Sequence, residues 1–243
     1  MRRWAAGLLF CAVAVVLALK VVCPRVGGQP KAPATPAAGS GPKPIAKVAT
    51  AAPAVTPAAL AAMSYPQRFA ALCAACHGAN GRIETPLTPV LAGQPSLYVI
   101  TQLFLFREGR RSNEAMTAVA KTLTDDDLRG FSEVIGALPP VPAPPPATPP
   151  DPSRMASGRA LAEQHKCVFC HGAGLAGGQQ VPCIKGQHEE YLQVSLRGFH
   201  SGSRPGYTQA MTAAVSQIPP EDLDTLAYYA ARFQDPGAAL TGK

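Results

Sequence analysis

The sequence predicts an all-α protein that contains the same domain twice. Matched residues recur along the 243-residue chain at an offset that drifts between 93 and 95. No run alternates between apolar and polar side chains as a half-buried strand would, so we expect few or no sheets. The predicted parts are an anchor at 1–26, a disordered tether at 27–62, a first domain at 63–138, a Pro-rich linker at 139–150 and a second domain at 151–243.

The predicted anchor is an apolar run at 4–23 that follows Arg2 and Arg3 and is interrupted by Lys20. About 20 residues suffice to span a bilayer, and Lys20 can extend its ammonium group to the interface. The two arginines would keep the N-terminus in the cytoplasm, which exports the rest of the chain. We therefore expect an uncleaved transmembrane helix. The alternative is a secretory signal peptide, removed at the weak cleavage sequence 26–28.

The predicted tether, residues 27–62, is rich in Ala, Pro and Lys and lacks hydrophobic periodicity. Such a segment cannot bury a core, so we expect it to be disordered and extended; the alternative is an accidental low-complexity insertion. The chain has a formal net charge of +7, but residues 1–62 contain basic residues and no acid, and the remainder holds equal numbers of each. The predicted domains therefore have no basic stripe, and we expect no nucleic-acid partner.

A Cys-x-x-Cys-His sequence occurs in each predicted domain, at 73–77 and at 167–171, and Gly follows both copies. This spacing is the attachment signature of c-type haem. The two thiols lie near one face of a helical turn and can add to the haem vinyl groups, and the histidine can ligate the iron. The sequence thus predicts two covalently bound haem c groups, with thioether bonds from four cysteines and one axial histidine each: Cys73, Cys76 and His77, then Cys167, Cys170 and His171.

Zinc and redox sites also use Cys-x-x-Cys pairs. A zinc site would require the two repeats to share one metal, and it would leave the His-Gly extensions unexplained. A thioredoxin-like enzyme would require a βαβ unit, which the pattern does not contain. Haem attachment explains both copies with fewer assumptions.

Matched methionines provide the second predicted axial ligand of each haem. Met116 and Met211 lie in identical Ala-Met-Thr-Ala sequences, 39 and 40 residues after the preceding motif histidine. A thioether ligand favours ferrous iron, raises the reduction potential and closes the sixth position, which suits electron transfer. The alternative is core packing, the commonest role of a methionine. We assign core packing to Met63 and Met155, which have no equivalent methionine at the corresponding position of the other repeat.

Helices are expected at 65–75, 97–106, 124–138 and 219–233. Thr124 precedes three aspartates, a typical capped N-terminus, and proline suits the first turn of the last helix. The linker at 139–150 is too rich in proline for a helix or a central strand. It either runs along the surface between packed domains or holds them apart.

The order of these motifs resembles the dihaem cytochrome c4 family. The resemblance covers residues 64–138 and 154–234: Cys-x-x-Cys-His-Gly, then Pro-x-Leu/Ile-x-Gly-Gln, a tyrosine, Ala-Met-Thr-Ala and a helix containing Asp-Leu. It implies two class I cytochrome c folds related by a pseudo-twofold axis, in an electron carrier rather than an enzyme. By the same analogy, the carbonyls of Pro89 and Pro182 would accept hydrogen bonds from the axial histidines.

We therefore expect a carrier at the periplasmic face of the bacterial inner membrane. It would pass single electrons from a quinol-oxidising complex to a terminal oxidase or reductase and would take no small-molecule substrate. One alternative is a dihaem subunit of a dehydrogenase or oxidase complex. Another is a dihaem peroxidase or thiosulfate-oxidising enzyme with an unusual sixth ligand such as Cys183.

Arg111 and Arg204, at matched positions, either pair with haem propionates or are solvated. If the anchor is cleaved, the protein would be soluble in the periplasm.

Overall fold

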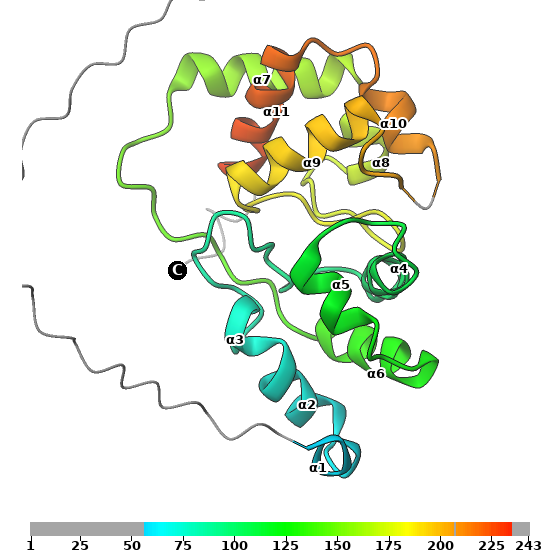
Figure 1. The fold of residues 1–243 in the computed structure, drawn as a ribbon. Coiled ribbons are helices and arrows are strands. Elements are labelled where there is room, and N and C mark those ends of the chain that lie inside the picture. Colours follow the sequence, from blue (N-terminus) through cyan, green and yellow to red (C-terminus); the bar gives the residue numbers. More distant parts are fainter. Residues whose placement is uncertain (1–55, 207, 235–243) are drawn as a thin grey trace, which may run out of the picture. The chain divides into compact units, whose positions relative to one another are not determined.

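The computed structural model describes residues 56–206 and 208–234, and within them the regular structure is helical (Figure 1). The β pairing in this part of the chain is a single isolated bridge between Gly178 and Val181. The all-helical prediction is therefore confirmed for the described residues. The predicted anchor lies outside them.

Five helices of the first repeat correspond in order to five of the second. The first repeat contains α2 (Tyr65–Leu72), α3 (Ala74–His77), α4 (Ser96–Arg107), α5 (Glu114–Ala120) and α6 (Asp125–Gly136), preceded by α1 (Pro57–Ala61). The second contains α7 (Pro152–Gln164), α8 (Cys167–His171), α9 (Glu189–Ser201), α10 (Ala210–Val215) and α11 (Pro220–Ala231). In both repeats the first and last of the five helices pack together, and the third packs on the last.

Local sequence signals explain where several helices begin. The Thr124 hydroxyl accepts the backbone N–H of Asp127, whose carboxylate accepts that of Thr124, which forms a reciprocal capping box at α6. Asn113 caps α5 through the backbone N–H of Met116. Asp151 caps α7, and Pro152 occupies its first turn. The cap on α5 thus fixes the backbone at Met116.

Each repeat buries its own hydrophobic core. Phe69, Val99, Leu103 and Phe131 are among the residues at the centre of the first. Leu192, Val215, Leu223 and Ala227 are among those at the centre of the second. Burial of these side chains is the main force that holds the short helices together, because helices of this length are marginal in isolation.

Two segments differ in helix content from the sequence prediction, which gave no bounds for α5, α7, α9 and α10. The end of the segment predicted to be a disordered tether forms α1, since Thr56 caps it and Pro57 starts its first turn. The helix predicted over 65–75 breaks at Cys73, so the first motif has its own short helix. In the second repeat Lys166 adopts φ +55° immediately before the motif helix. Both breaks separate the motif helix from the helix before it.

The described residues include no helix that is both long and apolar enough to cross a bilayer. The predicted span at 4–23 and the predicted tether up to residue 55 fall outside the described part of the chain.

The proline-rich linker runs against the protein at both of its ends. At its start, Leu138 accepts the N–H of Gly93 at 3.1 Å. At its end, the Asp151 N–H donates to the Tyr228 hydroxyl at 2.7 Å. The linker does not hold the repeats apart, because hydrogen bonds join them directly, as from Arg82 Nη1 to the Gly186 carbonyl at 2.9 Å.

Candidate haem sites

The two motif histidines are buried in equivalent environments. Each is 6% exposed. The Nδ1 atom of His77 lies 3.0 Å from the Pro89 carbonyl oxygen, and that of His171 lies 3.0 Å from the Pro182 carbonyl oxygen. A hydrogen bond of this kind places the proton on Nδ1 and leaves Nε2 as the free donor atom for a metal. Burial lowers the pKa of both histidines, which favours the neutral, ligating form.

The motif cysteines divide into an inner and an outer thiol in each repeat. Cys73 and Cys167 are half-buried against their cores, whereas Cys76 and Cys170 are exposed. Burial, together with the neighbouring Cys76, raises the pKa of Cys73 to about 11, and burial also raises that of Cys167. A thiol that stays protonated at neutral pH is a poor nucleophile, so burial makes the two inner cysteines unsuited to thioredoxin-like exchange. Within the described residues, no three His, Cys, Asp or Glu side chains are grouped as a metal site would require.

The matched methionines share a core with the matched inner cysteines. Met116, on α5, packs half-buried against the core that Cys73 also contacts. Met211, on α10, packs half-buried against the core that Cys167 contacts. Met155 belongs to the second core too, and it lies on α7, away from the matched position. The structure therefore gives each repeat one buried histidine and one methionine that packs on the same core as the inner motif cysteine.

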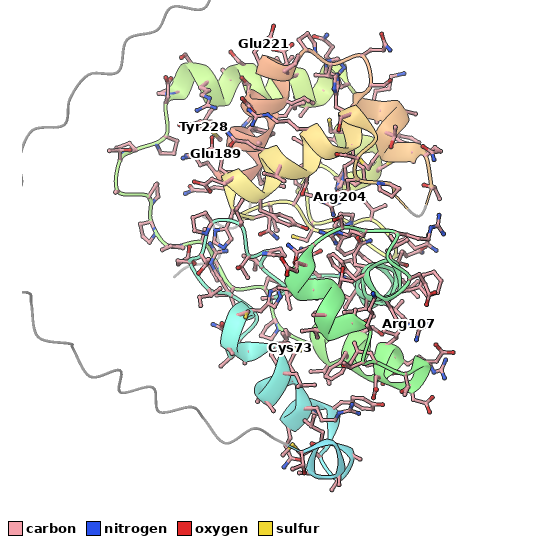
Figure 2. The ribbon with its side chains drawn as sticks, viewed as in Figure 1. Cys73, Arg107, Glu189, Arg204, Glu221 and Tyr228 are labelled. Atoms are coloured by element: carbon pink, nitrogen blue, oxygen red, sulfur yellow. The ribbon has the colours of Figure 1, made fainter. Side chains whose placement is uncertain are left out.

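Two arginines and two tyrosines form a polar cluster between the repeats. Arg111 Nη2 donates to the Tyr191 hydroxyl at 2.8 Å, and Arg204 Nη2 lies 3.5 Å from the hydroxyls of both Tyr98 and Tyr191. Arg111 also bonds Gln102. Figure 2 shows Arg204 among the side chains between the two repeats. Both guanidiniums belong to the side-chain packing of the protein, so solvation does not explain them.

This cluster is positively charged and has no acidic partner in the described part of the chain. The side-chain partners of both arginines there are uncharged, with Ser195 completing the set. Burial raises the pKa of Tyr191, but the two guanidiniums outweigh burial and lower it to about 7. Desolvated cations require anionic partners. The carboxylates of a bound haem would be partners of this kind, so the residues present fit the group that the motifs predict.

Two further residues of the second repeat, Cys183 and His188, carry side chains that can ligate iron. Cys183 is half-buried, burial raises the pKa of its thiol, and its Sγ lies 4.0 Å from the Lys185 carbonyl. His188 contacts the first repeat instead, with Nε2 2.8 Å from the Ile83 carbonyl oxygen.

The sequence prediction missed two buried glutamines, Gln94 and Gln187, each 5% exposed. Both end the repeated Pro-x-Leu/Ile-x-Gly-Gln motif. Their recurrence was visible in the sequence, but no role followed from it.

Comparison with known proteins identifies relatives over most of the described residues. No protein-family model matches the chain. It is 33% identical over 170 residues to a thiosulfate dehydrogenase electron acceptor of Thiomonas intermedia, across 61% of this chain and 77% of that protein. It is 30% identical over 182 residues to cytochrome c4 of Pseudomonas aeruginosa, across 67% of this chain and 84% of that one.

A solved structure supports the same assignment. Reduced recombinant cytochrome c4 from Pseudomonas stutzeri superposes with a TM-score of 0.62 at 25% identity, over 70% of this chain and 97% of that chain. Sequence relatives, fold and paired motifs agree. The chain belongs to the cytochrome c4 family and is a dihaem electron carrier with two covalently bound c-type haems.

Proposed function

We propose that this chain is a periplasmic carrier, tethered to the inner membrane by its N-terminus, that moves single electrons from a quinol-oxidising complex to a terminal oxidase or reductase. In this proposal His77 and Met116 are the axial ligands in the first repeat, and His171 and Met211 in the second. The observation that carries it is the equivalence of the two repeats: each has a buried histidine bonded to a backbone carbonyl, and a methionine that packs on the same core as the inner motif cysteine.

Equivalent sites favour a carrier over a dihaem enzyme. Haem supplies one-electron chemistry, and ligands on both sides of the iron exclude a substrate from it. An enzyme would need one repeat to differ at its sixth ligand. For Cys183 we propose no ligand role: its thiol lies 4.0 Å from the Lys185 carbonyl oxygen, and Met211 already fills the sixth position in this proposal.

A second candidate donor is a thiosulfate dehydrogenase. The relative from Thiomonas intermedia is named for accepting electrons from that enzyme, and the similarity covers 77% of its length. This candidate keeps the same ligands and changes only the protein from which electrons arrive.

An exposed aromatic ring supports docking at the second repeat. Phe169 lies between Cys167 and Cys170 and is 87% exposed, whereas the corresponding residue of the first repeat is Ala75. Exposed apolar side chains are enriched at the centres of protein interfaces. A redox partner with an apolar contact surface would cover this ring close to the attachment site.

Rapid-mixing kinetics with each purified donor distinguish the two candidates. We expect Phe169→Ser to slow reduction by the true donor by about tenfold, the typical effect of losing an interface aromatic. Val194→Ser, 59% exposed on α9, is the matched control and should change the rate little. If neither donor reduces the wild-type protein faster than it reduces an unrelated cytochrome c, the proposed donors are wrong.

Cell fractionation tests the tether. The full-length chain should be found by haem staining in the washed membrane fraction, and a chain lacking residues 1–26 behind a cleavable signal should be found in the periplasmic extract. If cells that express the full-length chain instead release a haem-stained product, shortened at its N-terminus, into the soluble periplasm, the anchor is removed.

A further inference from the structure

Two buried glutamines connect the repeats in a reciprocal manner. The Gln187 side chain accepts the Val90 N–H at 2.8 Å and donates to the Val90 carbonyl at 3.0 Å. The Gln94 side chain accepts the Cys183 N–H at 3.1 Å and donates to the Cys183 carbonyl at 2.8 Å. Glutamine is mostly exposed in proteins, and a buried one must satisfy its amide. Here each amide is satisfied by the backbone of the other repeat.

The backbone N–H groups that the glutamines bind belong to the peptide bonds beside the proposed axial histidines. Pro89 and Val90 share one peptide unit: its carbonyl faces His77 Nδ1, and its N–H donates to Gln187. The Pro182–Cys183 peptide has the same arrangement, with His171 at its carbonyl and Gln94 at its N–H. Each histidine is therefore one peptide unit away from a glutamine of the opposite repeat.

Hydrogen bonds at the two ends of one peptide group strengthen each other. An acceptor at the N–H polarises the amide and makes its carbonyl oxygen a better acceptor, by roughly 10–30% per bond in condensed-phase estimates. A stronger acceptor at Nδ1 makes the imidazole a more basic ligand, and a more basic ligand stabilises the ferric state. The glutamine amide thus acts on the histidine ring of the other repeat through a short, direct chain of bonds.

We propose that Gln94 and Gln187 are positioning residues that act across the interface, Gln94 on His171 and Gln187 on His77, so that each repeat adjusts the reduction potential of the other. This inference rests on the proposed assignment of the two histidines as axial ligands. If the inference holds, the contact between the repeats sets the two reduction potentials in addition to stabilising the fold.

The test compares Gln94→Leu with Gln187→Leu in the full-length, haem-loaded protein. Leucine preserves the volume and removes the two bonds to the other repeat; at Gln187 it also removes the bond from the His188 N–H. A redox titration followed by nuclear magnetic resonance assigns each potential to one repeat, and the Nδ1–H resonances report each histidine hydrogen bond. Gln94→Leu should raise the potential of the second repeat and move the His171 Nδ1–H signal upfield. Gln187→Leu should do the same to the first repeat and to His77.

Controls separate this effect from a loss of structure. Gln164→Leu, at the exposed end of α7, should leave both potentials unchanged. If leucine disrupts the interface, Gln94→Asn and Gln187→Asn keep a polar amide that is one methylene too short, and the same crossed pattern should appear. A shift in the mutated repeat itself, equal shifts in both repeats or no shift would overturn the proposal.

Failure of the axial assignment is visible independently. In the wild-type reduced protein, iron-bound histidine and methionine resonances are displaced far from their ordinary positions by the haem ring current. Ordinary positions for His77 and His171 would overturn the assignment and the inference together. If the wild-type signals are displaced but a glutamine variant does not change the potential of the opposite repeat alone, only the inference is overturned.

Discussion

The Arg111 guanidinium lies 2.8 Å from the Tyr191 hydroxyl, although the two residues belong to different repeats. Arg204 approaches the same hydroxyl from the second repeat. One phenol therefore receives two cations, and its pKa is lowered to about 7 although burial alone would raise it. The ionisation of Tyr191 therefore affects the free energy of unfolding of a structure in which this cluster joins the two repeats.

Replacing Arg111 with glutamine should raise the pKa of Tyr191 and change how stability depends on pH. The wild-type phenol has a folded pKa below its unfolded value of about 10. It therefore contributes stability that increases from about pH 7 to pH 10 and is lost as pH falls through about 7. Denaturant unfolding between pH 6 and 9 should show this increase in the wild type and a smaller one in Arg111→Gln. Tyr191→Phe is the control, and an unchanged slope in it would contradict the assignment to this phenol.

Removing the axial methionines should affect one haem at a time. Met116→Ala should lower the potential in the first repeat and Met211→Ala that in the second, because the ligand that favours ferrous iron is lost. Each variant should also bind exogenous imidazole or carbon monoxide, as followed by absorbance spectra. Met155→Ala is the matched control: it packs on the second core and should reduce stability by about 2–4 kcal/mol without opening the iron. Unchanged potentials in both axial variants would exclude these methionines as ligands.

Asp127 should stabilise the first repeat above about pH 4. Burial raises its pKa, but hydrogen bonds to its carboxylate from Arg68, at 2.5 Å, and from the Thr124 N–H lower the pKa further than burial raises it. A lowered folded pKa contributes stability that is present above the unfolded value and lost as pH falls through the folded one. Asp127→Asn should therefore cost about 1–3 kcal/mol at pH 7, the value of a bond to a charged group, and progressively less below pH 4.

The control for this measurement is Asp126→Asn in the same helix turn. Asp126 is exposed and pairs with Arg129 on the surface, so its loss should change the free energy of unfolding by less than about 1 kcal/mol. Equal effects of the two substitutions at pH 7 would show that burial of Asp127 contributes nothing.

Gly158→Ala should weaken the contact between α7 and α11. A Cβ at this position would lie 2.4 Å from Tyr229 Cβ and 3.0 Å from the Thr225 carbonyl oxygen, so the helices would have to separate. Overpacking of this kind costs about 1–3 kcal/mol, partly offset by the better helix propensity of alanine. Ser157→Ala, on the exposed side of α7, is the control. Denaturant midpoints equal to the wild type would show that the two helices have room to adjust.

The sequence predicted the parts of the fold that depend on local or repeated patterns. Thr124 and the aspartates after it predicted the start of α6, and the spacing of the motif thiols indicated the helical turns now seen in α3 and α8. The break at Cys73 was not predicted, because an unbroken apolar pattern runs through it. The helix at 57–61 was not predicted either, since five residues are too few for periodicity to reveal.

The contacts between the repeats could not be predicted from the sequence. Gln187 and Val90 are 97 residues apart, and Arg111 and Tyr191 are 80 apart. No local propensity determines such pairs; they follow from how two folded cores meet. The repeated glutamine was visible as a pattern. Its binding partner lies in the other repeat, and aligning the two repeats shows which residues are equivalent but not which residues are in contact.

The exchange of equivalent bonds by Gln94 and Gln187 is the geometry of a symmetric homodimer, in which one surface pairs with its own copy. Duplication and fusion of a gene for such a dimer would preserve this geometry and add only a connecting segment. Fusion also allows the two halves to diverge. In a homodimer a substitution changes both subunits, whereas in the fused chain it changes one repeat. Phe169 and Ala75 are one such divergence. The ancestral pair would have had two identical electron-transfer faces, whereas the fused chain can distinguish an entry side from an exit side.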